Sequence, residues 1–190
     1  MGKCNIYAAG SLTDDDLQTR SIFVDMYCYA YSDRAEQPLP LITWGAGPCM
    51  IAVFHNRVES RGCLAHIAAA GENKDMMDHF ERATDQLTRM FERSGKPTAA
   101  DIYLLAGRSF VYETEYPQAN PERIDYSAHL QKFLYPFKDP SYQVHRYNAV
   151  ETGQVLYWPS KDSLFILSNL ELQTLQARVI KVDAQRKRFL

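Results

Sequence analysis

Short apolar runs alternate with turn residues along most of the chain, which is typical of a sheet-rich domain. Residues 49–55 and 62–69 are two apolar runs joined by a polar loop, so we expect a hairpin with both strands in the core. Residues 21–31 alternate tightly and predict one half-buried strand, with one face formed by Ile22, Val24, Met26, Cys28 and Ala30.

The hydrophobic period changes over residues 75–93. Apolar residues recur there at steps of three and four, and Ser94-Gly95 ends the pattern; the apolar positions are Met76, Phe80, Ala83, Leu87, Met90 and Phe91. We expect an amphipathic helix that packs against a sheet.

The rest of the chain is again strand-like. A short helix is expected after Pro121, and strands are expected at 101–106, 109–116, 142–150, 153–158, 164–167 and 177–182. The sum predicts the α+β class: a layered, mostly antiparallel β-sheet sandwich flanked by one or two helices. With 190 residues, 46% of them hydrophobic, the chain is expected to form a single domain over residues 1–190.

Charge and hydropathy limit the partners. The formal net charge is -2 with no long run of one sign, so we expect no nucleic acid partner. No stretch reaches the roughly 18 to 20 apolar residues of a membrane span. Asp14-Asp15-Asp16 comes before any signal-like apolar segment, which predicts a cytoplasmic protein, or one secreted into a host cell without a cleavable signal peptide. The sequence carries no signal for an oligomeric state.

The cysteines and histidines show no metal-binding spacing. Cys4, Cys28, Cys49 and Cys63 form no C-x-x-C pair, which excludes a zinc knuckle and a thioredoxin-like motif. A reduced chain fits best, and two disulfides are the alternative in an oxidising compartment. No i, i+4 histidine pair stands near a carboxylate, so no metal site is expected.

Cys49 follows a glycine-rich turn and begins an apolar run, in the segment TWGAGPC. A thiol nucleophile requires a general base, and a hairpin turn near Val58 would place His66 opposite Cys49 on one face. An imidazole there could deprotonate the thiol or form an ion pair with it. Thr43, six residues before Cys49, could return alongside and orient the imidazole.

An acyl-transfer site also requires donors for the oxyanion. Gly47 and the Cys49 amide are the candidates, because Pro48 contributes no N–H. Trp44 could wall the entrance to the site, with core packing as the alternative.

Each of these residues also has a structural interpretation. A cysteine that begins an apolar strand is usually a core residue, and a histidine on a neighbouring strand is often structural. Cys63, three residues before His66, lies on the opposite face by alternation and is expected to be structural.

The segment TWGAGPC, followed by LAHI so that the histidine stands seventeen positions after the cysteine, resembles the CheD chemoreceptor glutamine deamidases. It is also similar to the catalytic domains of cytotoxic necrotizing factor and Burkholderia lethal factor. The resemblance covers roughly residues 40–108, including the expected helix at 75–93 and the segment 102–107.

This resemblance implies a cysteine-dependent protein glutamine deamidase, with no metal and no organic cofactor. It implies Cys49 as nucleophile, His66 as general base and then acid, and Thr43 as orienting residue. The partner would be a protein with an exposed Gln or Asn, and the chain could be a bacterial effector or toxin. Two alternatives stay open: a thiol transglutaminase or protease, and a non-catalytic binding module with the same fold.

Overall fold

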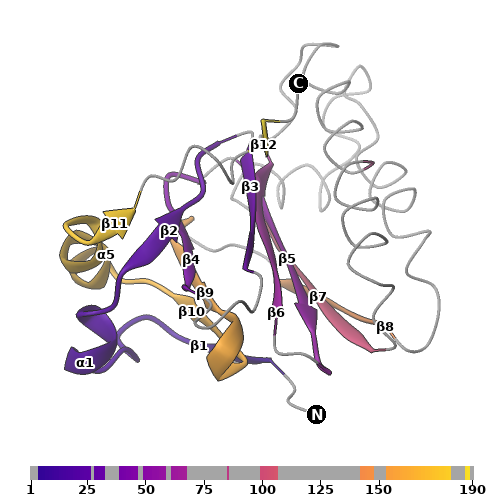
Figure 1. Cartoon of the computed structure of the whole chain (residues 1–190), viewed down its shortest axis with the longest axis horizontal. Coiled ribbons are helices and arrows are strands. Elements are labelled where there is room, and N and C mark those ends of the chain that lie inside the picture. The colour runs from indigo at the N-terminus through magenta and orange to yellow at the C-terminus, as the bar shows by residue number, and fades with distance from the viewer. Residues whose placement is uncertain are drawn as a thin grey trace, which may run out of the picture.

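Two sheets facing each other form the body of the protein (Figure 1). The computed structural model describes residues 4–26, 28–32, 39–46, 49–58, 61–67, 85, 99–106, 142–147, 153–180 and 187–188. In this part of the chain strands predominate and short helices flank one sheet, so the expected α+β class is confirmed.

The first sheet is mixed. Its strand order is β1-β10-β9-β4-β2-β11, and its strands are Asn5–Tyr7 (β1), Ser163–Ile166 (β10), Val155–Trp158 (β9), Leu41–Thr43 (β4), Ser21–Phe23 (β2) and Val179–Ile180 (β11). Strand β9 runs antiparallel to both β10 and β4, whereas the other neighbouring pairs are parallel.

The second sheet is antiparallel except at one edge, where β7 and β8 are parallel. Its order is β12-β3-β6-β5-β7-β8, and its strands are Lys187–Arg188 (β12), Cys28–Ser32 (β3), Arg61–Ile67 (β6), Met50–Asn56 (β5), Ala100–Ala106 (β7) and Tyr142–Tyr147 (β8). The predicted hairpin is confirmed as β5 and β6, and the predicted strands at 101–106, 153–158 and 164–167 correspond to β7, β9 and β10.

The single strand predicted over 21–31 is wrong. Residues 21–23 form β2 of the first sheet and residues 28–32 form β3 of the second, so the chain crosses between sheets at the corner 24–28. Four of the five residues predicted to share one face are buried between the sheets: Ile22, Val24, Cys28 and Ala30. The fifth, Met26, is 44% exposed. A period of two continues across a corner and cannot reveal it.

Three of the predicted elements are not tested. The strand at 109–116 and the short helix after Pro121 lie outside the described residues, as does the helix at 75–93 except for Asp85, which is helical. The strand predicted at 142–150 is described as β8 up to Tyr147. Of the strand predicted at 177–182, residues 177–178 form a turn and Val179–Ile180 form β11, while residues 181–182 lie outside the described residues.

Apolar side chains fill the space between the sheets. This sandwich core includes Ile22, Val24, Leu41, Cys49, Ile51, Val53, Leu64, Leu105, Val155 and Leu164. A second group, the outer cluster, covers the other face of the first sheet and includes Phe23, Ile42, Leu156, Trp158, Phe165, Leu172 and Leu175. The alternation of Leu41 and Ile42 between these groups shows that β4 presents successive side chains to opposite faces.

Two short helices lie beside the outer face of the first sheet (Figure 1). Helix α1 is Asp14–Leu17 and helix α5 is Asn169–Gln176. Ser168 caps α5 in a reciprocal arrangement with Glu171, a capping box that satisfies backbone N–H groups at the helix start. Among the helices in the described ranges, none is long and apolar enough to cross a membrane.

Glu171 also ties an N-terminal loop to α5. Its carboxylate accepts hydrogen bonds from the backbone N–H of Gly10 at 2.9 Å, of Leu12 at 3.1 Å and of Ser168 at 2.7 Å. Burial alone would raise the pKa of Glu171, but these donors outweigh it and hold the pKa below its usual value.

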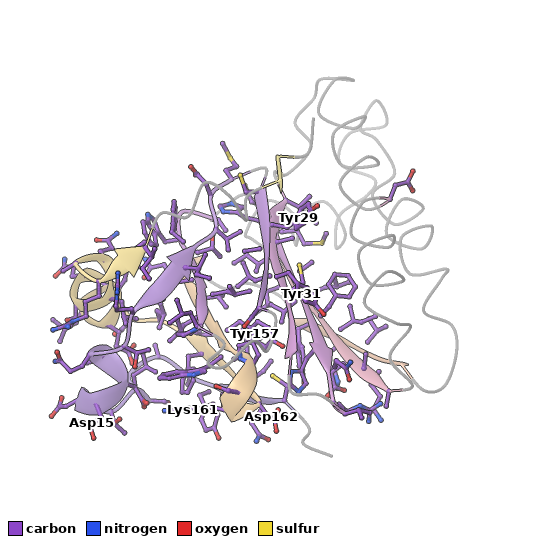
Figure 2. The ribbon with its side chains drawn as sticks, in the orientation of Figure 1. Asp15, Tyr29, Tyr31, Tyr157, Lys161 and Asp162 are labelled. Carbon is purple, nitrogen blue, oxygen red and sulfur yellow. The ribbon has the colours of Figure 1, made fainter. Side chains whose placement is uncertain are left out.

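A polar bridge joins the two sheets at one end of the sandwich. His55 on β5 meets Tyr157 on β9, with 2.7 Å between Nδ1 and the phenolic oxygen, and both side chains are 0% exposed. Figure 2 shows Tyr157 between the sheets. His55 Nε2 also lies 3.2 Å from Oδ1 of Asp162. Gly62, opposite His55, leaves room for this bridge, because a Cβ there would lie 2.3 Å from the Tyr157 oxygen and 1.9 Å from the Phe54 carbonyl oxygen.

Candidate active site

A second polar bridge joins the sheets through two of the predicted site residues. Thr43, the last residue of β4 in the first sheet, lies opposite His66 on β6 of the second sheet, and 2.9 Å separates Oγ1 from Nδ1. Thr43 is 0% exposed and His66 is 2% exposed. The sequence predicted that Thr43 would return beside the imidazole, and the structure has that contact.

The hydrogen-bond directions at Thr43 fix the tautomer of His66. The Thr43 hydroxyl lies 2.7 Å from the Val24 carbonyl oxygen, which can only accept a hydrogen bond. The hydroxyl has a single hydrogen, and donating it to Val24 leaves its oxygen as an acceptor for His66. Neutral His66 therefore carries its proton on Nδ1 and presents an unprotonated Nε2.

The environment keeps this imidazole neutral at physiological pH. Burial lowers the pKa of His66 to about 4, and the Asp25 carboxylate acts in the opposite direction with a smaller effect. Nε2 is buried and has no hydrogen-bond partner among the described residues. A buried acceptor in this state costs free energy, so Nε2 is open to a hydrogen bond from a donor group brought next to it.

Cys49 shares the interior face with His66 but does not pair with it directly. The predicted register is wrong by two residues: His66 pairs with Ile51, because β5 and β6 continue to Asn56 and Arg61 before the chain turns. An even shift preserves the face, and Cys49 packs in the sandwich core with Ile51. Residues offset in this way across two strands lie about 7–8 Å apart between Cα atoms.

The Cys49 amide, predicted to help stabilise an oxyanion, is already engaged. It donates to the carbonyl of Ala46 at 2.9 Å, and the Ala46 amide donates to the carbonyl of Gly153 at 3.2 Å. An N–H group that donates within a turn is not available to an oxyanion unless the turn opens. Gly47, the other predicted donor, lies outside the described residues, as does Pro48.

Trp44 belongs to packing rather than to the entrance of the site. Its ring stacks on Phe23 with centroids 3.9 Å apart, and it packs against the outer cluster. Thr43 faces inward and Trp44, the next residue, faces outward, as alternation requires. Gly45 then turns the chain with φ of 74°, a left-handed conformation that glycine adopts without strain.

Three contributors to the site were not predicted, all from the corner 24–28. The Val24 carbonyl orients Thr43, the Asp25 carboxylate acts on His66, and Cys28 pairs with His66 on the neighbouring strand β3. A backbone carbonyl leaves no trace in a sequence. The exposed pair Asp25-Met26 within an alternating run was the available signal for a corner.

All four cysteines are described and buried, and none forms a disulfide. Cys63 pairs with Phe54 and faces away from His66, as predicted by alternation. Within the described residues, no group of three or more His, Cys, Asp or Glu side chains is placed to hold a metal ion.

Comparison with known proteins identifies no family. No model of a known protein family matches the sequence, and no curated protein matches it. Among solved structures, the crystal structure of the Bacillus licheniformis hypothetical protein YfiH is similar with a TM-score of 0.40 and 13% identity, over 85% of this chain and 67% of that chain. A similarity at this level is too low to indicate a shared function.

Proposed function

We propose that the chain is a cysteine-dependent amidohydrolase that deamidates glutamine side chains of proteins, as its resemblance to the CheD deamidases implies. One observation carries the proposal: Thr43 fixes His66 with an unprotonated Nε2 that has no partner within the described part of the chain, on the same face as Cys49. A base held in the correct tautomer by a third residue is what activation of a thiol nucleophile requires.

The proposed reaction uses only these groups and water. Cys49 Sγ attacks the carboxamide carbon while its proton passes to His66 Nε2. The proton then moves to the leaving nitrogen, ammonia departs, and a thioester remains. Water attacks the thioester with His66 again as base, which releases glutamate and restores the thiol.

The low pKa of His66, about 4, disfavours a resting thiolate–imidazolium pair and leaves the neutral imidazole as the form that would take the thiol proton during the attack. This supports one of the two forms of activation expected from the sequence. The proposal also includes the substrate class, a protein with an exposed Gln or Asn, and the setting, a bacterial effector or toxin acting on a host protein. It requires an oxyanion donor other than the Cys49 amide, or an opening of the turn at Ala46.

A second candidate, a non-catalytic binding module, is favoured by burial. Thr43, Cys49 and His66 are 0%, 3% and 2% exposed, so a protein substrate reaches them only after a conformational change. In this alternative the three residues serve packing, and Cys49 is no more reactive than another buried thiol.

Iodoacetamide labelling as a function of pH, read for each cysteine by mass spectrometry, separates the two candidates. A deamidase predicts that Cys49 is labelled faster than Cys4 and Cys63 between about pH 5 and 8 and loses this advantage in His66→Ala. Burial raises the pKa of Cys4 to about 12 and also raises that of Cys63, which makes both internal controls. Equal labelling of the three thiols would refute the catalytic proposal.

The reaction itself is tested with glutamine-containing proteins. The expected product is one mass unit heavier at a glutamine, with release of ammonia, and Cys49→Ala abolishes it while Cys63→Ala does not. Incorporation of an added primary amine would identify a transglutaminase instead, and cleaved fragments would identify a protease.

A further inference from the structure

An exposed corner of the chain lies next to the candidate site. This corner carries the chain from β2 to β3 (Figure 1), and within it Asp25 is exposed whereas Val24 and Cys28 are buried. The Val24 carbonyl oxygen lies 2.7 Å from Oγ1 of Thr43. Cys28, at the other end of the corner, is the strand partner of His66. The corner is thus held against the site at both ends, while its tip meets solvent.

The Asp25 carboxylate acts on the site through its charge. Asp25 directly follows Val24, so its Cα lies about 3.8 Å along the chain from the residue whose carbonyl holds Thr43. Oδ1 of Asp25 accepts the backbone N–H of Met26 at 2.9 Å, which keeps the carboxylate at the turn. Its negative charge raises the pKa of His66 against the larger effect of burial. A charge that acts on the imidazole also acts on a charged group brought beside it.

The charge of Asp25 has a consequence for the choice of substrate. A negative charge beside a reacting centre attracts basic side chains near the target glutamine and repels acidic ones. It also repels the product, because glutamate carries a negative charge that glutamine lacks. We propose that Asp25 is a specificity-determining residue that favours target glutamines with a lysine or arginine close by and disfavours those with acidic neighbours. This inference rests on the proposed function, in which Cys49 and His66 are the reacting groups.

Methanethiosulfonate reagents of similar size measure this charge preference at Cys49 in the full chain. The aminoethyl reagent carries a positive charge, the sulfonatoethyl reagent carries a negative charge, and the hydroxyethyl reagent carries none. In each reaction the Cys49 S–H bond breaks and its proton passes to Nε2 of His66, a disulfide bond forms to the reagent, and methanesulfinate leaves. The cysteine sulfur is oxidised and the sulfonyl sulfur is reduced. Mass spectrometry reads the labelling rate of each cysteine at about pH 6, above the His66 pKa of about 4.

Asp25→Asn removes the charge and keeps a side-chain oxygen that can accept the Met26 N–H. The rate with each charged reagent is divided by the rate with the neutral reagent, so that a change in the strength of the base cancels. Two unit charges about 8 Å apart in water change a rate about twofold. We therefore expect Asp25→Asn to lower the cationic ratio and raise the anionic ratio, each about twofold, and both shifts to vanish in about 0.5 M salt. Asp25→Glu retains the charge and should retain the wild-type ratios.

Asp15→Asn is the matched control, because it removes the same charge from an exposed position on α1, beside the outer face of the first sheet (Figure 2). Opposite shifts of the two ratios in Asp25→Asn, with wild-type ratios in Asp15→Asn, support the inference. Unchanged ratios in Asp25→Asn, or equal shifts in Asp15→Asn, overturn it and leave the proposed function standing where labelling of Cys49 still depends on His66. Labelling of Cys49 that is the same in His66→Ala overturns the proposed function and the inference with it.

Discussion

Replacing Thr43 with valine tests how firmly the first sheet controls His66. The substitution exchanges the hydroxyl for a methyl group at a site that is 0% exposed. It removes the 2.7 Å hydrogen bond to the Val24 carbonyl and the 2.9 Å hydrogen bond from His66 Nδ1. Leaving a buried polar group without a partner costs about 1–3 kcal/mol, so two such groups set an upper range of about 2–6 kcal/mol.

Without the Thr43 oxygen neither ring nitrogen of His66 has a hydrogen-bond partner among the described residues, so moving the proton from Nδ1 to Nε2 only relocates the stranded donor and the two tautomers become comparable in energy. We therefore expect Thr43→Val to lower the free energy of unfolding by about 3 kcal/mol. The molecules that carry the proton on Nε2 cannot accept another there, so labelling of Cys49 should slow about twofold.

Urea unfolding at pH 7 measures the stability change, and nitrogen NMR shifts of the His66 ring report the tautomer. Thr43→Ser is the matched control: it loses one methyl group, at about 1 kcal/mol, and keeps both hydrogen bonds and the tautomer. A stability loss below about 1 kcal/mol in Thr43→Val, or an unchanged tautomer, would refute the reasoning that Thr43 orients His66.

Three further substitutions test the fold. Glu171→Gln should lower the free energy of unfolding by about 2 kcal/mol at pH 7. Because folding lowers the pKa of Glu171, this stabilisation is present above the unfolded pKa of about 4.3 and is lost as the pH falls through the folded value. A difference from wild type that persists in urea unfolding at pH 2 would contradict this account. Gly62→Ala should lower the free energy of unfolding by at least about 3 kcal/mol, because the added Cβ would overlap the Phe54 carbonyl. In Gly10→Ala the added Cβ meets no atom within 4 Å, so this variant should lose only about 1–2 kcal/mol, for its positive φ. Similar thermal transitions for the two variants would argue against this account. Tyr157→Phe should cost about 1–3 kcal/mol by depriving His55 of its 2.7 Å partner, and an unchanged urea midpoint would show that this bridge contributes nothing.

The sequence predicts the sheet elements well where one pattern corresponds to one strand. The β5–β6 hairpin and strands β7, β9 and β10 follow from their apolar runs. Helix α5 was missed, although Ser168-Asn169-Leu170-Glu171 is a capping-box pattern, because its apolar positions are too few to give a clear helical period.

The candidate site was predicted in part, where its geometry follows from local patterns. Spacing places Thr43 beside His66 and puts Cys49 on the correct face, since both depend only on periodicity and a turn. The exact register, the engaged Cys49 amide and the position of Cys28 depend on tertiary contacts between distant segments. Local sequence patterns do not encode such contacts.

The two polar bridges have a mechanical consequence for the sandwich. Burial of apolar surface is non-directional, so it fixes the relative position of two sheets less strictly than a hydrogen bond does. Hydrogen bonds between Thr43 and His66, and between His55 and Tyr157, do not tolerate sliding of the sheets, since each requires its two atoms within about 3 Å. These two bridges, formed by different strand pairs, restrict both translation and rotation of one sheet over the other. The sheets are thus expected to separate by hinging about one bridge, with shear disfavoured, and opening at Thr43 while the His55 bridge holds would bring His66 to the surface.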